Sequence, residues 1–288
     1  MSAAAVDGER ARAVIALAVV GVLWSTAGAL IMAVEWPPAA IWGLRSAIAA
    51  LALGAIARPS LRGLTGAEWA SAAALAITTG LFILANKWTT PANAILIQYA
   101  APAWAAIMAA VFLREPARAI DGVTIALALA GVALFFLDEL SFAHQRGNAV
   151  ALIAGVTFAA NVVLLRHIAR RPGGGSSSAL RAMWLGQALA AVVALPWVVT
   201  APALPATGWA AMLALGLVQQ TATTLLYAWA IRRVTAVEGL LLPIVEPILS
   251  PVWVGLAFAV WPGPMALVGG AIVVAAVTLR GWVAARGG

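Results

Sequence analysis

The sequence predicts an all-α, polytopic membrane protein with ten transmembrane helices in two five-helix inverted repeats. Of its 288 residues, 64% are hydrophobic and only 9% are charged, and the mean hydropathy is +1.01. A soluble domain carries charge on roughly a quarter of its residues. Apolar runs of about 20 residues, long enough to cross a bilayer as a helix, recur along the whole chain. A weak similarity between the two halves predicts the repeat.

Ten apolar segments are expected to form helices, and Pro37, Pro38 and Pro91 would stand at helix starts, where a missing N–H costs little. The first segment is too long for the core of a signal peptide, so we expect it to be retained. The stretch Arg170–Ser178, RRPGGGSSS, would be a flexible loop. The predicted helices cover residues 11–34, 37–57, 67–88, 91–113, 119–137, 147–168, 178–199, 208–231, 235–260 and 264–284.

The cationic residues predict the orientation in the membrane. With the N-terminus in the cytoplasm, fourteen arginines lie in segments on the cytoplasmic side, whereas the opposite side holds only Lys87 and Arg146. Positive charge concentrates on the cytoplasmic side of membrane proteins. Both termini are therefore expected in the cytoplasm, in a protein of the inner or plasma membrane. The net charge of +7 then belongs to loops beside the lipid bilayer, and no nucleic-acid partner is expected.

An internal repeat divides the chain into residues 1–146 and 147–288. The segment Gly21–Gly28, GVLWSTAG, parallels Gly155–Val162, GVTFAANV. At one constant offset, Leu81, Ala85, Thr90, Leu96 and Pro102 match Leu226, Ala230, Thr235, Leu241 and Pro247. Because each half holds five predicted helices, the second half must enter the membrane from the opposite side. Inverted repeats of this kind are a transporter architecture, with the binding site at the repeat interface.

Two apolar segments carry a family resemblance. They are Thr89–Pro116, TTPANAILIQYAAPAWAAIMAAVFLREP, and Val234–Leu256, VTAVEGLLLPIVEPILSPVWVGL. With Arg45 early in the second predicted helix and the spacing of Gly122 and Gly131, they resemble the EamA-type members of the drug/metabolite transporter superfamily. The resemblance covers essentially the whole chain. It implies a ten-helix transporter and is specific for the family rather than for a substrate.

Within this superfamily, the tryptophan-rich chain and the block TTPANAILIQYAAPAW are most similar to the aromatic amino acid exporters of the YddG type. One feature departs from the family pattern. Trp261–Pro262 stands where a glutamate is expected after the ninth helix, whereas the first half keeps Glu115–Pro116. If that glutamate closes a gate in relatives, the gate of the second half is altered here.

The ninth predicted helix is apolar, yet it carries three prolines and a carboxylate. Pro243, Pro247 and Pro251 each lack an N–H and clash with the preceding turn, so the helix should be kinked. The carbonyl groups that lose their donors, with the carboxylate of Glu246, are costly in lipid unless they face protein or water. Glu246 would bind a substrate ammonium group or a proton. A carboxyl group that seals the kinks by hydrogen bonding is the alternative.

Polar and aromatic side chains of the other helices are expected to complete a central cavity. The eighth helix bears the stripe Gln220, Thr223, Thr224 and Tyr227, which is either a cavity wall or a set of interhelical hydrogen bonds. For Trp24 the alternative is helix packing, and for Tyr99 it is a buried side chain whose hydroxyl group only forms a structural hydrogen bond. With Glu246, the expected lining residues are Trp24, Ser25, Phe82, Gln98, Tyr99, Pro102, Phe158, Asn161, Gln220, Thr223 and Tyr227.

Two cations accompany this set. Arg45, about two turns into the second helix, would meet a substrate carboxylate as a bidentate fork. A structural ion pair, or snorkelling to the interface, is the alternative. Lys87, at the outer end of the third helix, would attract anions to the mouth or simply be solvated. Because Arg45 is the one arginine expected in the cavity, a strongly anionic substrate such as a sugar phosphate is not expected.

These observations predict a secondary transporter that exports amino acids or related small metabolites, aromatic and large apolar ones included, by alternating access through a central cavity. The alternative is a broad-specificity drug or quaternary-amine exporter, with Glu246 as counter-charge and tryptophans as a cation–π cage. An enzyme is not expected, because the chain has no cysteine, two histidines near helix ends, and no HExxH or GxSxG motif. No catalytic residue, metal or cofactor is expected, while proton coupling and facilitated diffusion both stay open.

Overall fold

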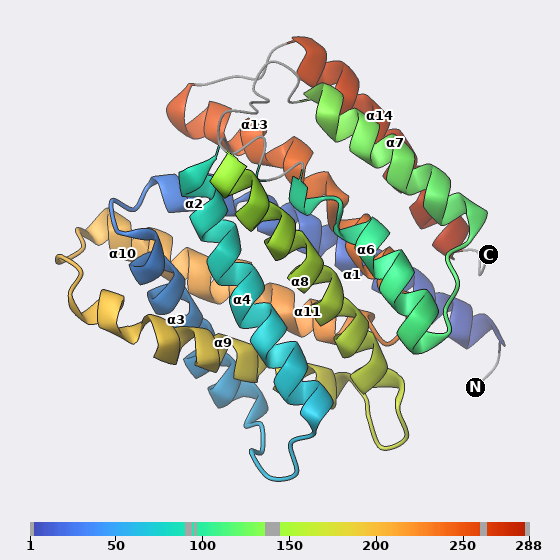
Figure 1. Ribbon diagram of the computed structural model, residues 1–288, viewed down its shortest axis with the longest axis horizontal. Helices are drawn as coiled ribbons and strands as arrows, with labels where there is room; N and C mark the ends of the chain where they lie inside the picture. Colours follow the sequence, from blue (N-terminus) through green and yellow to red (C-terminus); the bar gives the residue numbers. More distant parts are fainter. Residues whose placement is uncertain (1–2, 90–93, 95–96, 136–144, 260–263, 286–288) are drawn as a thin grey trace.

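Helices run side by side through the computed structural model, which describes residues 3–89, 94, 97–135, 145–259 and 264–285 (Figure 1). These residues form no strand, which confirms the all-α prediction for the described part of the chain. Several residues on which sequence predictions rest lie outside the described residues: Thr90, Pro91, Leu96, Trp261–Pro262 and one of the two histidines, His144.

Up to residue 135, helical elements occur where the sequence predicts them. The first predicted helix is interrupted at Thr26, whose hydroxyl donates to the carbonyl oxygen of Leu23 at 2.7 Å. The third begins at a capping box formed by Thr65 and Glu68. The elements are α1 (Ala3–Ser25), α2 (Ala27–Met32), α3 (Pro38–Ala57), α4 (Gly66–Trp88), α6 (Ala101–Met108), the π-helical η1 (Ala109–Leu113) and α7 (Ala119–Phe135).

From residue 145 onward, the predicted eighth and ninth helices each consist of three consecutive elements with a π-helical or 3₁₀-helical centre. The loop expected over Arg170–Ser178 is shorter than predicted, because the serines join the next helix behind Gly175 as N-cap. The elements are α8 (Gln145–Arg170), α9 (Ser176–Val199), α10 (Ala206–Leu213), η3 (π, Ala214–Ala222), α11 (Thr223–Ala230), α12 (Ala236–Leu241), η4 (3₁₀, Leu242–Val245), α13 (Glu246–Phe258) and α14 (Pro264–Ala285).

The helices have the length and surface of membrane spans. Among the described residues, seven helical stretches are long and apolar enough to cross a bilayer, and Ala101–Leu113 and Ala119–Leu134 are shorter apolar helices. Large apolar side chains cover the outside; Leu51 and Phe112, for example, are exposed over more than two thirds of their surface, at 75% and 73%. Such a surface is unfavourable in water and suited to lipid. The chain is therefore a multi-pass membrane protein.

Small residues let the helices approach closely. A Cβ atom added at Gly43 of α3 would lie 2.6 Å from Val198 and 2.7 Å from Ala194 of α9, so only glycine fits this contact. Close approach at small residues is a common way to pack helices in membranes, where lipid removes the hydrophobic driving force. Likewise, α4 packs against α8 and α9, and α7 lies along α14 at the margin of the molecule (Figure 1).

The ninth predicted helix is broken at the 3₁₀ turn η4 between α12 and α13, as Pro243 and Pro247 predict, whereas α13 continues through Pro251. The carbonyl oxygen of Gly239, deprived of its donor by Pro243, accepts the hydroxyl of Tyr227 at 3.0 Å. The carbonyl oxygen of Pro243 accepts the backbone N–H of Glu246 within the 3₁₀ turn. A Cβ atom at Gly21 would lie 2.5 Å from that oxygen, so α1 contacts the break directly. Two carbonyl groups freed by the prolines thus have other hydrogen-bond donors.

Ion pairs join helix ends at one end of the bundle. All six ion pairs found between described residues link a residue before position 146 to one after it. Glu68, whose side chain is fully buried, pairs with Arg171 at 3.2 Å and with Arg181 at 2.6 Å. Glu115 pairs with Arg166 at 3.2 Å and also with Arg170. Two carboxylates of the first part of the chain therefore each hold two arginines of the second part.

A third group of charges continues this network. Arg10 pairs with Glu238 at 2.7 Å, and Arg233 pairs with Glu9 at 3.1 Å. Arg166 connects this group to Glu115 because it also donates to carbonyl oxygens in the loop after α11, next to Arg233. We call the whole network the ion-paired end; its members are Glu9, Arg10, Glu68, Glu115, Arg166, Arg170, Arg171, Arg181, Arg233 and Glu238.

Candidate functional site

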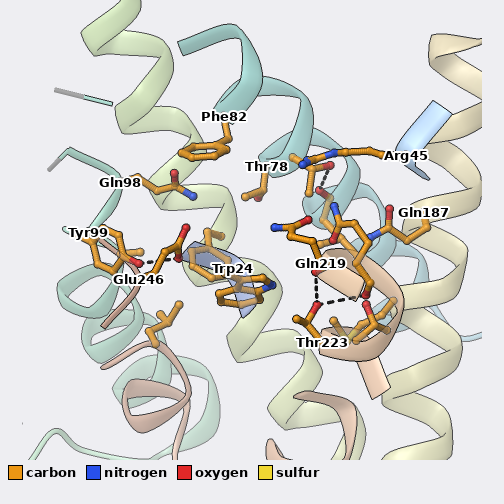
Figure 2. A pocket seen from close by; sticks show the side chains of 18 of the residues that line it. Trp24, Arg45, Thr78, Phe82, Gln98, Tyr99, Gln187, Gln219, Thr223 and Glu246 are labelled. Atoms are coloured by element: carbon orange, nitrogen blue, oxygen red, sulfur yellow. Dashed lines mark hydrogen bonds between the residues drawn. The ribbon is translucent and has the colours of Figure 1, made fainter. Parts of the chain in front are cut away.

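A cavity of about 100 Å³ lies among helices from both parts of the chain (Figure 2). A cavity needs roughly 10–15 Å³ of such volume to hold one water molecule, so this cavity has room for several groups of that size. The lining residues come from elements between α1 and α13 and are Trp24, Arg45, Leu75, Thr78, Thr79, Phe82, Gln98, Tyr99, Ala101, Pro102, Phe158, Met183, Gln187, Gln219, Gln220, Thr223, Thr224, Leu240 and Glu246.

One wall is a π-helix. In η3 the hydroxyl of Thr221 donates to the carbonyl oxygen of Gly216, five residues earlier, at 2.8 Å. The wider turn brings the consecutive residues Gln219 and Gln220 to the same cavity. The hydroxyl of Thr223 donates to the carbonyl oxygen of Gln219 at 2.6 Å and fixes the end of this turn. Isolated π-helical segments occur frequently at functional sites.

A carboxylate and a phenol meet on the opposite wall. Tyr99, just before α6, donates its hydroxyl to a carboxylate oxygen of Glu246 at 2.7 Å (Figure 2). Glu246 is the first residue of α13, so the break at η4 places its side chain at the cavity. The hydrogen bond joins the two parts of the chain inside the cavity, and one oxygen of the carboxylate is left for another donor.

Aromatic side chains line the cavity between η3 and Glu246. The ring of Trp24 stacks on Tyr227, with centroids 5.7 Å apart, and meets the edge of Phe158 at 6.0 Å. Both arrangements are favourable for aromatic pairs. Trp24 is therefore held in one orientation, and with Phe82 it offers an apolar surface to a ligand.

Three buried polar side chains lie across the cavity from Glu246 (Figure 2). They are Arg45 of α3, Gln187 of α9 and Gln219 of η3, and each has less than a tenth of its surface exposed. Within the described part of the chain, the Nε atom of Arg45 and the Oε1 atoms of both glutamines have no hydrogen-bond partner. The cavity thus has a cation on one side and a carboxylate on the other.

Most of the side chains predicted to line a cavity do border this one, while three do not. Ser25 accepts a hydrogen bond from the indole of Trp253 at 2.8 Å. Asn161 accepts one from Ser71 at 2.9 Å. Tyr227 is buried behind Trp24. The side chain of Lys87 lies outside the described ones. Those at the cavity are Trp24, Arg45, Phe82, Gln98, Tyr99, Pro102, Phe158, Gln220, Thr223 and Glu246.

Sequence reasoning missed several lining residues. The pair Thr78 and Thr79 in an alanine-rich helix and the lone amide of Gln187 in an apolar run were signals of the same kind as those used for the eighth helix. Gln219 could not be found by α-helical spacing, because the π-helix brings it in line with its neighbour. Apolar residues such as Met183 carry no sequence signal that separates a cavity wall from ordinary packing.

A multi-pass helical membrane protein with a central cavity of mixed polarity has the form of a transporter. Comparison with protein families supports this class: the model of the EamA-like transporter family matches residues 11–137 and 145–281. The chain therefore belongs to the EamA-like transporter family and is a membrane transporter of the drug/metabolite transporter type.

Comparison with individual proteins shows the fold. A solved structure titled "Crystal structure of protein" is 21% identical, with a TM-score of 0.77, and the alignment covers 96% of this chain and 99% of that one. Comparison with curated proteins gave no significant match. The match to the solved structure extends over almost the full length of both chains, so the whole arrangement of helices is shared.

Proposed function

We propose that this transporter exports amino acids and related small metabolites from the cytoplasm, those with aromatic and large apolar side chains included, in the manner of the YddG-type exporters. The observation that carries the proposal is the cavity itself. It combines a fixed aromatic surface at Trp24 and Phe158 with one carboxylate, Glu246, and one guanidinium, Arg45. An amino acid of this class has the same three components: an apolar side chain, an ammonium group and a carboxylate.

The proposed architecture is ten transmembrane helices in two five-helix inverted repeats, residues 1–146 and 147–288. The two separate matches to the family model support this division, since each begins near the start of a half. Residues of both halves line the cavity, as expected for a site at a repeat interface.

Alternating access would use the ion-paired end as one gate. The arginine distribution supports placing this end, with both termini, in the cytoplasm of a cell whose inner or plasma membrane holds the protein. Because every ion pair found there crosses between the halves, separating the halves would break the network while leaving each half intact. The charges would then be hydrated on the cytoplasmic side, which offsets part of the cost of breaking the pairs.

A broad drug or quaternary-amine exporter is the second candidate. It is favoured by one observation, that Glu246 and the face of Trp24 line the same cavity, as a cation site would require. The position of Arg45 in that cavity argues against it, because a guanidinium repels a cationic ligand.

Counterflow into liposomes tests the proposal. Purified protein is reconstituted into vesicles loaded with unlabelled phenylalanine, and we expect accumulation of labelled phenylalanine and methionine that lipophilic cations do not inhibit. Protein-free vesicles serve as the control. Counterflow of lipophilic cations without counterflow of amino acids would exclude the proposal in favour of the second candidate.

The same vesicles, with and without a pH gradient, distinguish proton coupling from facilitated diffusion. A transport rate that responds to the gradient in the unmodified protein, but not in the Glu246→Gln variant, assigns the proton to this carboxylate.

A further inference from the structure

Arg45 is a buried cation with no partner among the described residues. Its side chain extends from α3 to the cavity with only 2% of its surface exposed. Among the described residues, none forms an ion pair or hydrogen bond with it, and its Nε atom is fully enclosed. A guanidinium stays charged and presents five N–H donors. Since no described residue supplies acceptors for those donors, a molecule that enters the cavity can supply them.

Gln187 and Gln219, which line the same cavity, are also buried with a polar atom that has no partner among the described residues. Gln187 is 1% exposed and Gln219 is 7% exposed, and the Oε1 atom of each lacks a donor in the described structure. Buried side-chain polar atoms almost always have a partner. Six buried side-chain atoms without one occur in the described part of the chain, and three of them belong to these lining residues from three different elements. Such a concentration indicates a place where a ligand supplies the missing partners.

The chemistry of the three side chains selects a carboxylate. A carboxylate accepts two parallel hydrogen bonds from a guanidinium and has lone pairs left for two further donors. A half-turn of each glutamine amide exchanges the places of its oxygen and nitrogen, so that an N–H group points to the ligand where the Oε1 atom now lies. One cation matches one negative charge. A phosphate dianion would need further positive groups, and Arg45 is the only basic residue among the described residues that line the cavity.

Glu246 and Tyr99 lie across the cavity from Arg45, and Trp24 lies between the two sides (Figure 2). We propose that Arg45, Gln187 and Gln219 bind the carboxylate of the substrate while Glu246 and Tyr99 receive its ammonium group, so that the transporter selects zwitterions and holds them in one orientation. This inference rests on the proposed export of amino acids and assigns the substrate polarity to named residues.

The test compares three ligands that differ by one charged group. Equilibrium binding to the purified full-length protein is measured for L-phenylalanine, for 2-phenylethylamine, which lacks the carboxylate, and for 3-phenylpropionate, which lacks the ammonium group. For the unmodified protein we expect phenylalanine to bind at least about tenfold more tightly than either analogue, the scale expected for losing a charge-assisted hydrogen-bonded group.

The variants should separate the two sides of the cavity. Arg45→Gln should weaken phenylalanine and 3-phenylpropionate by about tenfold or more, whereas 2-phenylethylamine should bind equally well or more tightly, because a repelling charge is removed. Glu246→Gln should produce the opposite pattern, weakening phenylalanine and 2-phenylethylamine. Arg45→Lys keeps the charge without the fork and should recover part of the loss. The matched control is Arg146→Gln, which removes an exposed arginine at the start of α8 and should change none of the three affinities.

The outcomes distinguish a failure of the carboxylate assignment from a failure of the proposed amino acid export. Equal weakening of all three ligands by Arg45→Gln, or no change in any, overturns the inference and leaves the proposed function standing. Unmodified protein that binds none of the three ligands overturns both. If Arg45→Gln does not yield folded protein, Gln187→Leu and Gln219→Leu replace it, because each should weaken the two carboxylate ligands more than the amine. A loss confined to the amine would overturn the assignment.

Discussion

Two buried arginines show how differently the two regions of this transporter treat charge. At the ion-paired end, Arg166 donates to Glu115 at 3.2 Å and to the carbonyl oxygen of Ile231 at 3.1 Å. At the cavity, Arg45 is buried at least as deeply, yet no described residue pairs with it. Charges that hold the structure together are partnered, whereas the unpartnered charge stands where a substrate would bind. A buried charge without a partner lowers the stability of the ligand-free protein, and a bound ligand of opposite charge would restore it.

The largest expected effect comes from removing a partner at the ion-paired end. Glu68→Gln leaves Arg171 and Arg181 without their carboxylate and weakens the capping box of α4. Breaking a buried pair by removing one member costs about 3–5 kcal/mol, and the partial exposure of both arginines puts the expected loss near the lower end, about 3 kcal/mol. Thermal unfolding of the purified protein in detergent measures it.

The control for that change is Glu35→Gln, which removes an exposed carboxylate between α2 and α3. Its unfolding temperature should match that of the unmodified protein. Equal stability of the Glu68→Gln variant would show that the ion-paired end does not hold the two parts of the chain together.

A smaller effect of opposite sign is expected at the cavity. Arg45→Met removes a buried charge that has no partner among the described residues and keeps an unbranched apolar stem, so the ligand-free protein should gain about 1–2 kcal/mol of stability. Arg166→Met should lose stability, because it leaves Glu115 with Arg170 as its one remaining ion-pair partner among the described residues and removes the donor to two backbone carbonyl groups. Unfolding of both variants without ligand checks the contrast. Destabilisation by both would mean that Arg45 has a structural partner in the folded protein.

The smallest effect separates two tyrosine hydroxyl groups. Tyr227→Phe removes the donor to the carbonyl oxygen of Gly239 at the helix break and should lower stability by about 1 kcal/mol, with little change in ligand affinity. Tyr99→Phe removes the donor to Glu246 and should alter amine binding more than stability. Unfolding and equilibrium binding are measured for both. Interchanged results would assign Tyr227 to the cavity and Tyr99 to the structure.

The sequence by itself determined the membrane class, the approximate positions of the described helices and the break at Pro243. These properties depend on local causes: apolar runs are as long as a bilayer is thick, and a proline interrupts its own helix wherever that helix packs. Glu246 could be singled out in the same way, because a carboxylate in an apolar run is costly whatever surrounds it.

Only the tertiary structure decided which side chains share the cavity. Gln219 faces it because a π-helix changes the register of one turn, while Tyr227, on the predicted stripe, turns to a carbonyl oxygen twelve residues away. Whether Arg45 would find an ion-pair partner or be left for a substrate depended on the helices packed beside α3. Local spacing places a residue on one face of a helix. The rotation and contacts of neighbouring helices determine what that face meets.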